Sequence, residues 1–156
     1  MSEHARPKTH RPIISYKGEE PYAFFSYPHA YRNFVRELVR LLTENGVRVA
    51  TDGGTSYIDM PDEYYERIKN CRVYILELSH RTVDSQRVRK EIRCIDRNTP
   101  IIVLEKKKTA LDPELSHILS RAVYIKIRPF WKKDRDHLPQ YALSKLLPLL
   151  PRDIFI

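Results

Sequence analysis

The chain has 156 residues, which suits a single domain that can bury its own core. Its composition, 42% hydrophobic and 31% charged, is typical of a globular chain, and no apolar run approaches the roughly 20 residues that a membrane span needs. The net charge of +8 attracts polyanions, but the basic residues are scattered and not interleaved with aromatic residues, which argues against a face for single-stranded nucleic acid.

Residues 1–20 contain prolines among charged residues and show no hydrophobic period. We therefore predict a flexible basic tail, with a single domain over residues 21–156. The polar N-terminus has no apolar segment that would serve as a secretory signal. Cys71 and Cys94 read as free thiols, so a reducing cytoplasmic location is expected.

After residue 21, short apolar runs alternate with segments of helical period. Strands are expected at 22–27, 47–51, 73–78, 101–104 and 123–127. Helices are expected at 31–44, 62–70, from 84 or 85 to about 97, 113–120 and 138–147. Asn45-Gly46 is a typical end for the first helix, and Asp84 or Ser85 can cap the third.

This alternation predicts βα units and a parallel sheet covered on both faces. Five units indicate a flavodoxin-like, doubly wound α/β fold with strand order 2-1-3-4-5. Ligands of such folds bind outside the carboxyl ends of the strands, near the switch between the first and third strands. The polar loops after Tyr27, Thr51 and Ser79 open on that edge.

Several catalytic motifs are absent. The sequence has no GxGxxG or P-loop glycine pattern, no nucleophile elbow, and no paired cysteine spacing of a zinc site. We therefore expect neither a metal nor a bound cofactor.

The segment SQRVRKEIRCI, residues 85–95, places one carboxylate, Glu91, among four cations. Glu91 borders an apolar helix face made by Val88, Ile92 and Ile95, so we expect it to be partly desolvated at the rim of a cleft. The alternative is an exposed ion pair with Arg87, worth about 0.2–0.5 kcal/mol. Spacing alone favours the ion pair.

Five segments, in order, resemble motifs of the Toll/interleukin-1 receptor (TIR) domain family. They are Phe24-Phe25-Ser26-Tyr27, the strand that follows Asn45-Gly46 and ends in Asp52, residues 68–79, the helix with Ser85 and Glu91-Ile92, and Phe130-Trp131. The resemblance covers about residues 22–149. It implies the doubly wound fold and one of two activities. Some TIR domains are scaffolds that join other TIR domains, whereas others cleave NAD with a helix glutamate that Glu91 matches.

Cleavage of the nicotinamide–ribose bond builds positive charge on the ribose, and a carboxylate can stabilise that charge. The resemblance therefore implies an NAD glycohydrolase with Glu91 as catalytic residue, active when copies assemble and acting in immune or defence signalling. Its products would be nicotinamide and ADP-ribose or a cyclic isomer. NAD would be the substrate, and no cofactor is implied.

The alternative function is a non-catalytic TIR interaction module, and a third, weaker hypothesis is a relative of nucleoside-processing glycosidases. The family's tryptophan four residues before the glutamate is Arg87 here, which favours the interaction module. An arginine can nevertheless stack on a base or pair with phosphate.

The other candidates for substrate binding are Tyr27, His29 and Asp52, which follow the first two strands. Each has a structural alternative. Tyr27 would be a core aromatic residue, His29 would begin the helix, and Asp52 would cap the turn before Gly53, the role that its sequence context favours.

Overall fold

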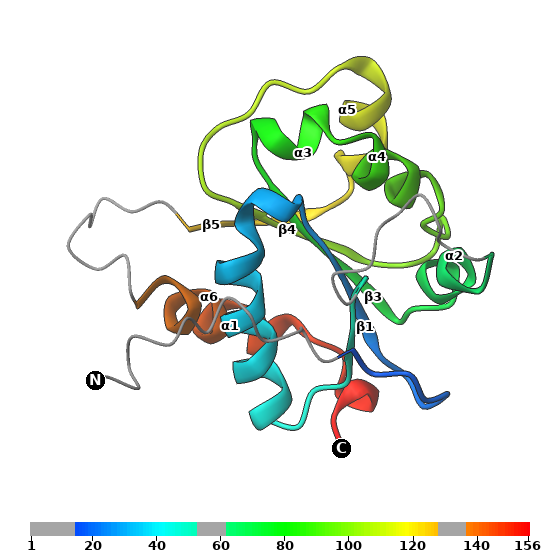
Figure 1. Cartoon of the computed structure of the whole chain (residues 1–156), viewed down its shortest axis with the longest axis vertical. Coiled ribbons are helices and arrows are strands. Elements are labelled where there is room, and N and C mark those ends of the chain that lie inside the picture. The colour runs from blue at the N-terminus through cyan, green and yellow to red at the C-terminus, as the bar shows by residue number, and fades with distance from the viewer. Residues whose placement is uncertain (1–14, 53–61, 128–136) are drawn as a thin grey trace, which may run out of the picture.

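The computed structural model describes residues 15–52, 62–127 and 137–156, and its strands form one parallel sheet (Figure 1). The strand order is β2-β1-β3-β4-β5, which confirms the predicted doubly wound fold. The strands are β1 (Ala23–Ser26), β2 (Val49–Ala50), β3 (Val73–Leu78), β4 (Ile101–Glu105) and β5 (Val123–Lys126). The helices are α1 (Arg32–Glu44), α2 (Asp62–Lys69), α3 (His80–Asp84), α4 (Gln86–Arg93), α5 (Pro113–Leu119) and α6 (Leu138–Leu146), with 3-10 turns at His29–Tyr31, Leu147–Leu149 and Arg152–Ile154.

Two hydrophobic cores lie on opposite faces of the sheet because successive strand residues point to opposite sides. Phe25 and Ile75 pack with α1 and α6, which lie side by side in Figure 1. Phe24 and Leu76 pack with α2, α4 and α5 on the other face. The fold therefore has three layers, and the carboxyl ends of the strands meet at one edge.

The predicted signals at helix ends are present. Gly46 follows α1 with a φ of 83°, a left-handed conformation that glycine adopts without steric cost. The Ser85 hydroxyl accepts a hydrogen bond from the Val88 N–H and so caps α4.

Strand β2 is shorter than predicted because the residues that precede it pair with the C-terminal segment. The Arg48 N–H donates to the Ile154 carbonyl, and Val47 forms an isolated antiparallel bridge with Phe155. The helix predicted from residue 84 or 85 to 97 is also shorter, and α3 precedes it. Ser79 and Thr82 form a capping box, which begins α3 directly after β3.

The described end of the predicted tail, residues 15–20, contacts the domain. The Tyr16 N–H donates to the Val49 carbonyl at 2.8 Å. The Arg67 guanidinium donates to the carbonyls of Tyr16 and Gly18 at 2.7 and 2.8 Å. Residues 1–14 lie outside the described part, so flexibility there stays a prediction. In the three described stretches, no helix has the length and apolar character to cross a bilayer.

Strand β3 contains an ionisable residue in an unusual position, because the Glu77 side chain is fully buried. Among the described residues, neither of its carboxylate oxygens has a hydrogen-bond partner, and Lys106 Nζ lies 4.0 Å from Oε2. Burial raises the pKa of Glu77 to about 7, and the nearby Lys106, Ser79 and Thr82 offset only part of this effect.

The raised pKa predicts a stability effect. The folded state holds the Glu77 proton more tightly than the unfolded chain does, so the free energy of unfolding should fall as pH rises from about 4.5 to about 7. We expect Glu77→Gln to remove this fall, so that the variant gains about 2 kcal/mol relative to the wild type between pH 5 and pH 8. Urea unfolding at the two pH values measures the gain, and a difference that does not change with pH would contradict it.

Candidate active site

Six elements, including β3 with Tyr74, bring polar side chains together near the carboxyl edge of the sheet. Ser26 ends β1, Asp52 follows β2, and His29 lies in the 3-10 turn between β1 and α1. Helix α2 contributes Tyr64, and α4 contributes the pair Arg87 and Glu91, one turn apart. Together with Tyr27 and Tyr74, we call these side chains the Glu91 network.

Asp52 contacts three other members of this network. Its Oδ1 accepts a hydrogen bond from the Tyr27 hydroxyl at 2.9 Å. Its Oδ2 lies 3.1 Å from His29 Nε2 and 2.9 Å from Arg87 Nη1. The sequence favoured a local role for Asp52 at the turn before Gly53, which lies outside the described residues. The described contacts of the Asp52 side chain are instead tertiary.

Glu91 also contacts three other members of the network. Oε1 accepts from the Ser26 hydroxyl at 2.6 Å, and Oε2 accepts from the Tyr64 hydroxyl at 2.5 Å and from Arg87 Nη1 at 2.8 Å. The Glu91 side chain is fully buried, so the expected place at a cleft rim is wrong. The reason is that Glu91 turns toward the sheet beside Val88, under the end of β1. Burial raises the pKa of Glu91, although Arg87 and the two hydroxyl donors offset part of this effect.

Arg87 links the two carboxylates of the network. Its guanidinium contacts Asp52 and Glu91, donates to the Tyr27 carbonyl, and is only 4% exposed. The predicted ion pair with Glu91 therefore exists, but it is buried rather than on the surface. Burial alone would lower the pKa of Arg87, but the charges of Glu91 and Asp52 outweigh this effect and raise it. With both carboxylates as partners, Arg87 is not free to bind a pyrophosphate in this arrangement.

Sequence reasoning missed three members of the network, which are Ser26, Tyr64 and Tyr74. Ser26 was considered only as part of a strand motif, yet its hydroxyl holds Glu91 and accepts from the Tyr74 hydroxyl. Tyr64 was read only as part of a helix. The available signal was the direction of side chains, because Phe24, Ser26 and Tyr74 point to the sheet face that α4 covers.

The network holds two carboxylates and one guanidinium, and this balance favours a positive charge nearby. Each oxygen of Glu91 accepts from a hydroxyl, so the same oxygens can accept from the hydroxyls of a ribose. Such a contact requires Tyr64 or Ser26 to give way.

The Tyr64 hydrogen bond leads to a testable prediction. Tyr64→Phe removes one donor from a buried carboxylate, and we expect the free energy of unfolding to fall by about 1–3 kcal/mol. Tyr65→Phe is the matched control, because the adjacent Tyr65 is also half-buried and its hydroxyl has no hydrogen bond to the described residues. Urea unfolding compares the two variants. Equal losses would show that the Tyr64 hydroxyl does not support Glu91.

Two further points concern possible metal ligands and an expected family motif. Within residues 15–52, 62–127 and 137–156, no three histidine, cysteine, aspartate or glutamate side chains gather as metal ligands would. The family motif expected at Phe130-Trp131 lies outside the described residues.

Comparison with known proteins gives a family and a fold. A family model described as a TIR domain matches residues 23–140. No curated protein matches the sequence significantly. Among solved structures, a flavodoxin-like domain from Synechococcus sp. is 13% identical with a TM-score of 0.50, over 82% of this chain and 99% of that one. This likeness supports the flavodoxin-like fold.

Two further structures lie at a similar distance. A diflavin flavoprotein A3 from Nostoc sp. is 15% identical with a TM-score of 0.47, over 86% of this chain and 100% of that one. A CMP N-glycosidase from Clostridium botulinum is 18% identical with a TM-score of 0.49, over 78% of this chain and 98% of that one.

Proposed function

This chain belongs to the TIR-domain family, and from that premise we propose that it cleaves NAD at the bond between nicotinamide and ribose. Glu91 is the proposed catalytic carboxylate, and the products are nicotinamide and ADP-ribose or a cyclic isomer. The observation that carries the proposal is the buried Glu91 at the sheet edge, held by hydroxyl donors that a ribose can replace.

In this proposal, the enclosed carboxylate stabilises positive charge on the ribose as nicotinamide departs. A low-dielectric site strengthens that attraction. Asp52 adds a second negative charge, and the Tyr27 and His29 side chains that contact it are the proposed substrate contacts. Arg87 acts mainly by orienting Glu91, since both carboxylates already occupy its guanidinium.

Assembly is proposed to activate the domain. Both Glu91 oxygens are occupied and shielded within the single domain, so substrate contact needs a rearrangement. In this proposal, contact between assembled copies would cause that rearrangement. The proposed setting is cytoplasmic immune or defence signalling, with other TIR domains as partners.

The second candidate is a non-catalytic interaction module. One observation favours it: the Glu91 carboxylate is fully satisfied by internal donors, as a structural carboxylate would be. In that case the network serves to fix α4 against the sheet.

Nicotinamide release tests the proposal. The protein is incubated with NAD at low concentration and again after clustering by a crowding agent, and nicotinamide is measured by chromatography. We expect little release from the dilute protein and clear release from the clustered protein. No release in any state of assembly would overturn the enzyme proposal in favour of the interaction module.

A further inference from the structure

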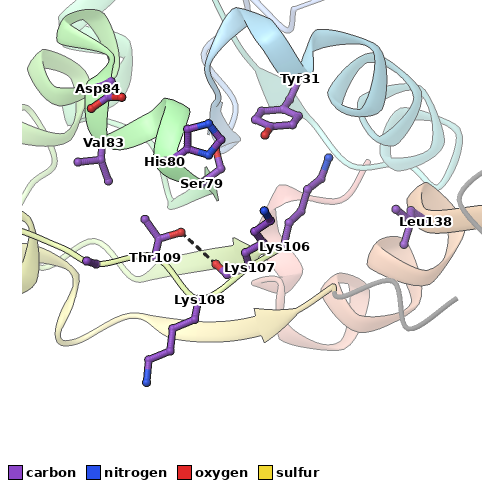
Figure 2. Close-up of a pocket in the computed structure, with 11 residues that line it drawn as sticks. Tyr31, Ser79, His80, Val83, Asp84, Lys106, Lys107, Lys108, Thr109 and Leu138 are labelled. Atoms are coloured by element: carbon purple, nitrogen blue, oxygen red, sulfur yellow. Dashed lines mark hydrogen bonds between the residues drawn. The ribbon is translucent and has the colours of Figure 1, made fainter. Parts of the chain in front are cut away.

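A second feature of the carboxyl edge is a cavity of about 580 Å³ beyond β3 and β4 (Figure 2). None of the described residues that line it belongs to the Glu91 network. Its lining includes Tyr31, Val83, Lys106, Lys107, Lys108 and Leu138. The volume falls within the range of about 300–1,000 Å³ found for small-molecule sites.

The lining combines cations with apolar surface. Three consecutive lysines, Lys106 to Lys108, follow β4 directly, and the side chain of Lys108 points away from the other lining residues in Figure 2. Val83 and Leu138 provide apolar contact at other parts of the wall. The combination fits a molecule with an anionic group and an organic body.

Lys106 is placed to bind an anion. Its Nζ lies 4.3 Å from the ring centroid of Tyr31 and 4.4 Å from that of Phe34, so two aromatic rings hold the ammonium group in place. The carboxylate nearest to it, Glu77, is 4.0 Å away, too far for a hydrogen bond. Among the described residues the ammonium contacts the two rings and forms an ion pair with Glu77, and it donates no hydrogen bond to any of them.

We propose that this cavity binds a phosphate-bearing small molecule of the nucleotide class. The phosphate contacts the ammonium groups of Lys106 and Lys107, and the organic part packs against Val83 and Leu138. The buried Glu77 carboxylate, 4.0 Å from the Lys106 ammonium, repels the anion and so limits the affinity. This site goes beyond the proposed NAD cleavage and does not depend on it.

Calorimetric titration of the full chain with ADP tests the site. Loss of a charge-assisted contact typically costs about 1.5–3 kcal/mol, so we expect Lys106→Gln together with Lys107→Gln to weaken ADP binding at least about tenfold. Lys69→Gln, at an exposed position on α2 outside the cavity lining, is the control for net charge. Absence of ADP binding, or an equal loss in that control, would overturn the proposal.

Three further titrations define what is bound and where. At pH 8, above the pKa of Glu77, Glu77→Gln should tighten ADP binding because it removes the opposing charge, and unchanged or weaker binding would contradict the role of Lys106. ADP should bind more tightly than inorganic pyrophosphate, and equal affinities would exclude recognition of the organic part. Glu91→Gln should leave ADP binding unchanged, whereas a loss would place ADP in the Glu91 network. The titration needs no turnover, so its failure leaves the NAD proposal intact.

Discussion

Glu91→Gln is expected to lower nicotinamide release from clustered protein by about 100-fold to 1,000-fold, the usual cost of removing one electrostatic stabiliser of a transition state. Glutamine keeps the shape of the side chain and an oxygen that accepts from Ser26 or Tyr64. It removes the negative charge on which the proposed stabilisation of the ribose depends. Initial rates with saturating NAD, measured side by side with the wild type, give the ratio.

The variant should remain folded, because the glutamine amide can still bond to its hydroxyl neighbours and Arg87 keeps Asp52 as an ionic partner. Thermal melting by circular dichroism checks this. Glu44→Gln at the exposed end of α1 is a matched control that should retain full turnover. Turnover of Glu91→Gln equal to that of the wild type would make Glu91 a structural residue and would require another catalyst.

The fold could be predicted from sequence because its signals are local. Each strand is a short apolar run, and each helix has its own period and end signals, such as Gly46 and Ser85. Parallel strands joined by helices permit few topologies, so the strand order followed from the alternation. The misjudged boundaries lie where distant segments compete for backbone groups, as Ile154 does beside β2.

The site could be predicted only in part, because its members are far apart in the sequence. The resemblance to the family pointed to Glu91, and the end of each strand pointed to Tyr27 and Asp52. The depth of Glu91 could not be predicted, since it depends on how α4 packs against β1. The second ionic partner of Arg87 could not be predicted for the same reason, because only the fold brings Asp52 to it.

Arg87→Met is expected to lower the free energy of unfolding by about 3–5 kcal/mol at neutral pH, the typical cost of removing one partner from a buried ion pair. The change leaves Asp52 and Glu91 buried without their common cation. Arg87→Lys should recover only part of this loss, because a single ammonium cannot reproduce the contacts of a guanidinium with two carboxylates and the Tyr27 carbonyl. Urea unfolding of the three proteins measures both effects.

The pH dependence of this loss identifies its cause. Without Arg87, the attraction that lowers the pKa of Glu91 is gone, so the already raised pKa should rise further. The folded variant then binds protons that its unfolded chain does not, and the destabilisation should shrink as pH falls toward the ordinary pKa of a carboxylate. Arg93→Met, at the exposed end of the same helix, should change stability little at any pH. A loss in Arg87→Met that stays constant with pH would mean that lost packing, and not unpaired charge, explains it. The Arg87 side chain would then matter for its volume, and Glu91 would owe its position to Ser26 and Tyr64 alone.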